Sequence, residues 1–215
     1  MADGRTVGGR RLSTGVATLD DHLDGGVPVG SLVAFKSPSS MQSELLLYTI
    51  AAQRRTVYVS TTRNDQLVRG TLDAVSVDVG DVQVTYAPPD TALEIASDAA
   101  LDAPEGANVI VDTADILEGY ERHEYQRFLN RLLIHLRNSG SIAVFHCHED
   151  DDEPAHRGLT EAMAEIVLEL HAEIDGASRE TYLAVPKFRS GRALTDLIKI
   201  ELTDEITVDT SRNIA

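Results

Sequence analysis

Short apolar runs alternate with longer amphipathic stretches along most of this chain, and this alternation limits the folds that it can adopt. The short runs are bounded by turn-forming residues and are rich in β-branched side chains, which is typical of buried strands. They cover residues 32–35, 56–60, 82–86, 108–111, 141–146, 181–185 and 198–202. The stretches between most of them have helical periodicity and cover residues 44–52, 65–74, 92–101 and 121–137. In the last of these, Phe128, Leu132 and Leu136 share one face, which we expect to pack on a sheet.

Strands that alternate with helices build a mostly parallel central sheet flanked by helices. The last two runs differ, because Ser190, Gly191 and Arg192 form a turn-like stretch between them and predict an antiparallel hairpin at the C-terminus. No Pro- or Gly-rich linker divides the chain. We therefore expect one α/β domain over residues 11–215, after a flexible N-terminal tail over residues 1–10.

The chain is strongly acidic, and this disfavours one class of partner. It has 35 acidic and 19 basic residues, a net charge of −16, and only three lysines against sixteen arginines. Such a surface stays soluble where salt screens charge over about 3 Å near 1 M, which favours an archaeal protein from a salt-accumulating cytoplasm over an acidic mesophilic one. Tight non-specific binding to nucleic acid is disfavoured, since no block of basic residues is present to neutralise phosphates.

The chain carries one cysteine, Cys147, which excludes a disulfide within the chain and a four-cysteine zinc site. No apolar run approaches the roughly 18 residues that span a bilayer, and the opening residues lack the apolar core of a signal peptide. We therefore expect a cytoplasmic protein.

The segment from Leu12 to Phe35, LSTGVATLDDHLDGGVPVGSLVAF, resembles the entry to the core of the RecA superfamily, in particular of KaiC-like and RadA/RadB-like archaeal ATPases. Residues 108–112, NVIVD, resemble the Walker B strand of these proteins. Residues 182–189, YLAVPKFR, are similar to a late strand that ends in a Lys-x-Arg pair, and residues 198–210 to the closing hairpin of KaiC-like domains. The resemblance implies a RecA-like fold over nearly the whole chain.

The chain departs from this family where a Walker A loop is expected. That loop, G-x-x-x-x-G-K-[ST], needs glycines to turn N–H groups onto phosphates, a lysine to neutralise them and a hydroxyl for magnesium. Residues 37–44 read SPSSMQSE, with Ser37 and Gln42 at the glycine positions. Ser43 stands at the lysine position and Glu44 at the hydroxyl position, and no Gly-Lys pair occurs anywhere in the chain. The Walker A motif is degenerate.

A second departure agrees with the first. In KaiC-like domains the strand after the phosphate-loop helix ends in acidic residues that position or activate the attacking water, and Thr62 and Arg63 stand at those places here. Hydrolysis would lack both its phosphate clamp and its water-positioning group. We expect no catalytic residue and no ordinary ATP hydrolysis, and ATP with magnesium is disfavoured as a cofactor.

Four residues mark the place of the vestigial nucleotide site. Asp112 ends the Walker B strand, and it either coordinates magnesium through water or, as we favour, is hydrogen-bonded to nearby Ser or Thr hydroxyls. Ser39, Ser40 and Ser43 either contact an anion at the start of the following helix or, as we favour, Ser43 caps that helix.

Two further groups have functional and structural interpretations. His146, His148 and Glu149 are weak candidate metal ligands, and the alternative is solvent-facing histidines in an acidic loop. Lys187 and Arg189 match the Lys-x-Arg pair that the resemblance places against the γ-phosphate of a neighbouring subunit, where an arginine acts in trans. The alternative is that these two residues are surface cations that compensate part of the negative charge of the many carboxylates.

Three classes of function follow from these observations. The first is a pseudo-ATPase that acts as a regulatory or scaffolding subunit, for example in signalling or transcriptional regulation, and pairs with itself or with an active RecA/KaiC-like ATPase. The second is a DNA repair and recombination accessory protein of the RadB type, which the acidic surface disfavours. The third is an enzyme with a metal-assisted site at the histidine cluster. Fold alone does not decide among them.

Overall fold

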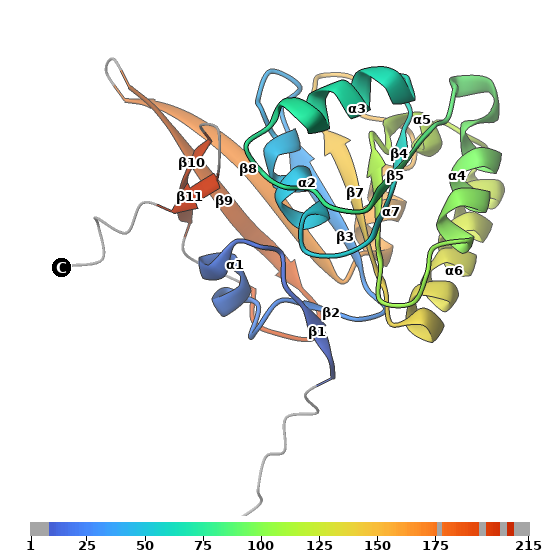
Figure 1. Cartoon of the computed structure of the whole chain (residues 1–215), viewed down its shortest axis with the longest axis horizontal. Helices are drawn as coiled ribbons and strands as arrows, with labels where there is room; N and C mark the ends of the chain where they lie inside the picture. Colours follow the sequence, from blue (N-terminus) through green and yellow to red (C-terminus); the bar gives the residue numbers. More distant parts are fainter. Residues whose placement is uncertain (1–8, 176–177, 194–196, 203–205, 209–215) are drawn as a thin grey trace, which may run out of the picture.

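The computed structural model describes residues 9–175, 178–193, 197–202 and 206–208. Its main sheet has nine strands in the order β11-β10-β9-β8-β3-β7-β6-β4-β5, with helices on both faces (Figure 1). The predicted α/β class, with a mostly parallel central sheet, is confirmed. Residues 1–8 of the predicted tail lie outside the described residues, and the carbonyl of Arg10 already accepts a hydrogen bond from the backbone of Val29.

The parallel part of the sheet contains every predicted strand up to His146. It is formed by β3 (Leu32–Ser37), β4 (Thr56–Ser60), β5 (Val82–Tyr86), β6 (Asn108–Asp112) and β7 (Ile142–His148). All side chains of β4 and β6 are buried, because helices cover both faces of the sheet. These strands therefore appear in the sequence as continuous apolar runs.

The other side of the sheet is antiparallel. The strand β8 (Ile166–Asp175), which the sequence did not predict, runs parallel to β3 and antiparallel to β9 (Ser178–Phe188). Strand β10 (Ile198–Leu202) pairs antiparallel with β9, and β11 (Ile206–Val208) pairs with β10. The predicted C-terminal hairpin is confirmed, and β8 joins it to the parallel strands.

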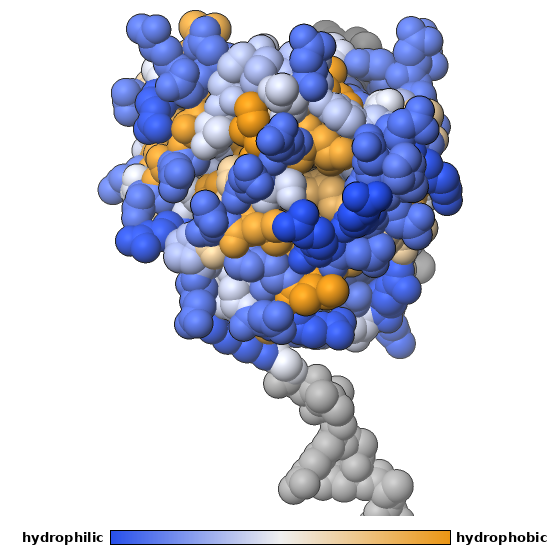
Figure 2. All heavy atoms as spheres, turned by 90° about the vertical axis from the view of Figure 1, so that its right-hand side faces the viewer, coloured by the Kyte–Doolittle hydropathy of each residue, from blue (hydrophilic) through white to orange (hydrophobic). Residues whose placement is uncertain are grey.

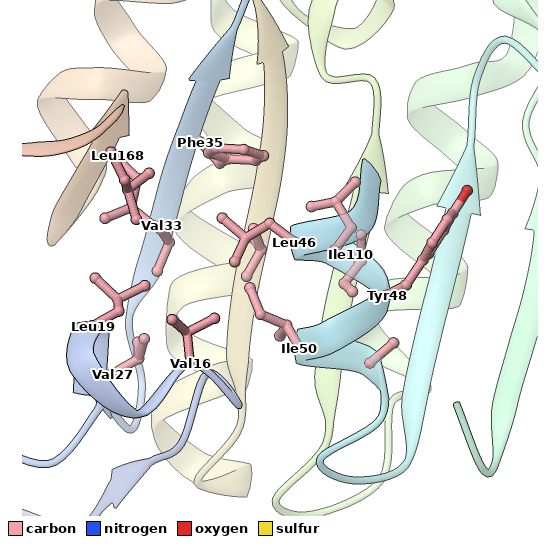
Figure 3. Packing of buried hydrophobic residues seen from close by; sticks show 14 of the residues in the cluster. Val16, Leu19, Val27, Val33, Phe35, Leu46, Tyr48, Ile50, Ile110 and Leu168 are labelled. Carbon is pink, nitrogen blue, oxygen red and sulfur yellow. The ribbon is translucent and has the colours of Figure 1, made fainter. Parts of the chain in front are cut away.

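Two helical layers bury two apolar clusters. On one face lie α2 (Glu44–Ala51) and α3 (Asp65–Ala74), whose apolar side chains pack with β3, β8 and the N-terminal segment (Figure 3). On the other lie α4 (Ala92–Leu101) and α6 (Arg122–Ser139), together with the short elements η1 (Pro89–Thr91), α5 (Asp115–Glu118) and α7 (Arg157–Met163). Phe128, Leu132 and Leu136 of α6 are buried as predicted. None of the helices in the described part of the chain is long and apolar enough to cross a membrane.

The N-terminal phrase of the family resemblance has a structural role. Strands β1 (Arg11–Leu12) and β2 (Val27–Pro28) pair around α1 (Ala17–His22), and the Asp20 carboxylate of α1 accepts hydrogen bonds from the hydroxyls of Ser13 and Thr14. Gly26 has a φ of 114°, and a side chain there would lie 2.4 Å from the Leu12 carbonyl oxygen. These contacts fold the entry segment against the core.

Candidate functional site

The candidate site lies where β3, β4, β6 and β7 end. Because these strands are parallel and in register, Ser37, Ser60, Asp112 and His146 reach the same edge of the sheet. The carboxyl edge of an open parallel sheet is where ligands of α/β proteins bind. The segment from Pro38 to Ser43 leads from β3 to α2 and occupies the place of the Walker A loop.

The side chain of His146 joins Ser37, at the end of β3, and Ser43, just before α2, to Asp112 at the end of β6. The Nε2 atom of His146 lies 2.9 Å from Ser37 Oγ and 3.0 Å from Ser43 Oγ, and its Nδ1 atom lies 2.8 Å from Asp112 Oδ1. All four side chains are buried. An ionised carboxylate only accepts hydrogen bonds, so the network assigns a ring proton to Nδ1, and both serine hydroxyls lie within hydrogen-bonding distance of Nε2.

The second oxygen of Asp112 is also occupied. Tyr58 donates its hydroxyl to Oδ2 at 2.6 Å, and the Arg63 guanidinium donates to the same oxygen at 2.8 Å. Burial alone would raise the pKa of Asp112, but the hydrogen bonds from His146 and Tyr58 and the charge of Arg63 lower it overall, well below its usual range. Burial and the neighbouring carboxylate raise the pKa of Tyr58 well above its ordinary value, so it stays a donor.

The loop before α2 does not form an anion cradle. The Met41 N–H binds the Pro38 carbonyl at 3.1 Å in a tight turn, and the Met41 side chain packs into the core. Ser39 donates its hydroxyl to Asp150 at 2.9 Å and its backbone N–H to the same oxygen at 3.4 Å. Glu44, at the first position of α2, and Asp150 place two carboxylates beside this loop.

The structure corrects two favoured interpretations of these residues. Ser43 does precede α2, but its side chain makes no capping hydrogen bond and instead contacts His146. Asp112 is not held by Ser or Thr hydroxyls, because Tyr58, Arg63 and His146 fill that role. Ser39 and Ser40 are both exposed, and Ser39 binds Asp150 instead of His146.

The candidate metal ligands His146, His148 and Glu149 do not form one cluster. His146 belongs to the buried network, His148 ends β7 and Glu149 follows the strand. His146 is 1% exposed, so the expectation of a solvent-facing histidine is wrong for this residue. The His146 and His148 rings lie on the same side of β7, with centroids 5.0 Å apart. Glu149 instead binds Lys36 at 2.9 Å. No group of three potential metal ligands converges within the part of the chain that the structure describes.

Lys187 on β9 and Arg189 just after it are separated from Asp112 on β6 by the strands β8, β3 and β7. Phe188, between them, pairs with Ile166 at the start of β8. Lys187 Nζ donates to the Glu161 carbonyl at 2.5 Å, and Arg189 donates to the Ala162 carbonyl at 2.6 Å. Both cations therefore satisfy the last carbonyls of α7, a favourable arrangement for positive charge at a helix C-terminus. Burial and the neighbouring Arg189 lower the pKa of Lys187.

Two ionic groups near the site had no signal in the sequence. Lys36 contacts Glu149, Glu161 and Glu169 at 2.9, 3.0 and 3.1 Å, and these contacts raise its pKa although burial alone would lower it. The buried Arg157 binds Glu118 at 2.8 Å and donates to the His148 carbonyl at 2.8 Å. Both groups join residues far apart in the chain, so only the fold brings the partners together.

Comparisons with known proteins agree with this architecture. A family model described as "Family of unknown function (DUF7125)" matches residues 11–215. The structure is similar to that of the KaiC-like protein PH0186 from the hyperthermophilic archaeon Pyrococcus horikoshii, with a TM-score of 0.74 over 94% of this chain and 99% of that chain. At 16% identity this likeness shows a RecA-like fold alone. No curated protein matches the sequence.

Proposed function

The chain belongs to the family of unknown function DUF7125, and from this premise we propose that it is a RecA/KaiC-like domain that does not hydrolyse ATP and works as a regulatory or scaffolding subunit. The observation that carries the proposal is the ion pair between Arg63 and Asp112. It places a cation where KaiC-like domains have an acidic residue, and that cation binds the carboxylate that would hold magnesium.

At this edge of the sheet, the carboxylate of Asp112, which would hold magnesium, is already bound by side chains of the protein. Both oxygens of Asp112 accept hydrogen bonds from side chains, so a magnesium-bound water would have to displace His146, Tyr58 or Arg63. Removing Arg63 alone would leave a buried carboxylate without its charged partner, which is costly. The network therefore favours a site in which the protein's own side chains occupy the place of the ligand. It favours a protein that works without bound nucleotide or metal.

ATP turnover by the purified chain tests this proposal. We expect no magnesium-dependent release of phosphate above a control without protein, and no ATP binding in a calorimetric titration. The variant Ser43→Lys should not gain turnover, because the loop lacks glycines and Glu44 and Asp150 keep their charge beside it. Steady hydrolysis that Asp112→Ala abolishes would overturn the proposal.

The partner we propose is a protein, either a second copy of this chain or an active RecA/KaiC-like ATPase. For the second case, Lys187 and Arg189 are the residues that would reach the phosphate of a neighbour, by their match to the Lys-x-Arg pair. This role does not need a nucleotide site in the chain itself. An arginine supplied in trans contributes roughly 10³ to 10⁵ in rate in other phosphoryl-transfer systems.

Co-purification at native salt, followed by turnover assays, tests the trans role. The chain should raise the ATP turnover of an associated ATPase, and Arg189→Ala should remove the stimulation while association is retained and the unfolding midpoint falls by no more than about 4 °C. Arg192→Ala, at an exposed arginine three positions further on, is the matched control and should keep the stimulation. Stimulation that survives the double change at Lys187 and Arg189 would leave only a scaffolding role.

We also propose a salt-accumulating archaeal source for the chain. The net charge of −16 and the three lysines support it, and the same acidic surface argues against DNA as the partner.

A further inference from the structure

A groove of about 350 Å³ separates the exposed faces of α4 and α6. Glu94 and Asp98, four residues apart on α4, line one side of it, and Arg127 and Arg131, four residues apart on α6, line the other. All four are exposed. In the part of the chain that the structure describes, none of their side chains has an ion pair or a hydrogen bond. One wall is therefore acidic, the other basic, and their charges are free to pair with another molecule.

Apolar surface accompanies these charges. Phe128 and Leu93 lie in the floor of the groove, and Ile134, one turn beyond Arg131 on α6, is 63% exposed. This face is toward the viewer in Figure 2, where orange apolar patches lie among blue hydrophilic side chains. Exposed apolar side chains rimmed by polar residues, with arginines among them, are typical of protein interaction sites.

We propose that this face is a self-complementary interface through which two copies of the chain associate about a two-fold axis lying along the groove. Both helices return from the carboxyl edge of the sheet to its other edge, so they run in the same direction. A two-fold rotation about the groove places α4 of each copy over α6 of the other. Glu94 and Asp98 then face Arg127 and Arg131 of the second copy, twice in the dimer.

A second copy fits this surface better than an unrelated acidic or basic partner. An acidic partner would meet Glu94 and Asp98, and a basic partner would meet Arg127 and Arg131, so each would be repelled by one wall. Two chains of charge −16 also repel one another overall, and local complementarity offsets that repulsion only at a face such as this. Asp90 and Glu124 at one end of the groove carry like charge, and salt screens their repulsion. The inference does not depend on the closed nucleotide site.

Charge reversal with exchange tests the proposal. Light scattering coupled to gel filtration, at about 0.5 M KCl, should show a dimer of the full chain. The variants Arg127→Glu/Arg131→Glu and Glu94→Arg/Asp98→Arg should each dimerise at least about tenfold more weakly, a loss of at least about 1.4 kcal/mol. Mixed in equal amounts, the two variants should form a heterodimer, because each acidic wall then meets a basic one.

The control carries the same change of charge as Glu94→Arg/Asp98→Arg, but on the opposite face of the sheet. Asp65→Arg/Asp73→Arg, at two exposed positions of α3, should dimerise as the unmodified chain does. A monomeric full chain, a dimer that both reversals leave unchanged, or two weakened variants that fail to pair when mixed would each overturn the proposal. Circular dichroism of every variant separates loss of association from loss of folding.

Discussion

At the scale of single residues, Asp112 keeps its charge in a buried position because donors surround it. Its pKa would be raised by burial alone, but the hydrogen bonds from His146 and Tyr58 and the Arg63 charge lower it overall. A carboxyl group whose pKa is lower in the folded than in the unfolded chain stabilises the fold above its unfolded pKa of about 4. That stabilisation is lost as the pH falls from about 4 through the folded pKa.

Asp112→Asn should therefore lower the free energy of unfolding by about 3 kcal/mol at pH 7, since it leaves Arg63 without its partner. The difference from the unmodified chain should shrink when urea unfolding is repeated near pH 3, where the carboxyl group of residue 112 binds a proton in the unfolded chain but not in the folded one. Asp73→Asn, at an exposed aspartate of α3, is the control and should change little at either pH. An equal loss at both pH values would show that the Asp112 charge contributes nothing.

The two serines on His146 should behave as a coupled pair. Ser37→Ala and Ser43→Ala should each cost about 1 kcal/mol or less, because the remaining hydroxyl still binds Nε2. The double variant should lose more than the sum of the singles, by about 1 kcal/mol, because a buried ring nitrogen then has no partner. A double-mutant cycle from urea unfolding measures this coupling, and strictly additive losses would contradict the shared contact.

At the scale of elements, the strands buried on both faces are readily predicted, and β5, which is only partly buried, was located as well. Strands β4 and β6 appear as continuous apolar runs because helices cover the sheet on both sides, and the sequence located each within a residue of its observed end. Strand β8 was not predicted, because Glu169, His171 and Glu173 interrupt its apolar positions. Strand β8 is held in place by its pairing with β3 and β9, and the local sequence pattern contains no information on that pairing.

The candidate site was predictable as single residues and not as a network. Ser43, Asp112 and His146 each stand out in the sequence, and Arg63 stands out as the replacement of an acidic residue. Their hydrogen bonds depend on the register that sets Asp112 opposite His146, across 34 positions of sequence. The sequence carried no signal for that register, so the expectation of a solvent-facing side chain at His146 was wrong.

Lys187 and Arg189 should stabilise α7 through its terminal carbonyls. Lys187→Ala/Arg189→Ala should lower the free energy of unfolding by about 1 to 2 kcal/mol, because cations at a helix C-terminus contribute roughly 0.3 to 1 kcal/mol each and the carbonyls lose their donors. Hydrogen exchange should show that the double variant speeds amide exchange in α7 relative to the unmodified chain, and does so more in α7 than in α6. Unchanged protection of α7 would mean that the pair is held for another purpose.

At the scale of the whole molecule, the charge of −16 opposes the compact state. The screening length falls from about 10 Å at 0.1 M salt to about 3 Å at 1 M, so repulsion between separate surface carboxylates fades over this range while the buried Arg63–Asp112 pair is screened far less. Salt should thus stabilise this chain through its surface and leave its closed site almost unchanged.

The thermal unfolding midpoint should rise by roughly 5 to 10 °C between about 0.1 M and 2 M KCl, since 2 to 3 kcal/mol corresponds to such a shift for a chain of this size. A variant separates screening from a general salt effect on apolar burial. Asp151→Asn/Asp152→Asn/Glu153→Gln removes three exposed charges from the loop before α7 without touching Asp150, which binds Ser39. Its midpoint should lie above that of the unmodified chain at low salt, and the two curves should converge at high salt, where repulsion is already screened. Calorimetry in parallel salt series measures both. Curves that stay parallel would show that salt acts on apolar hydration, and the acidic surface would then have no part in the response.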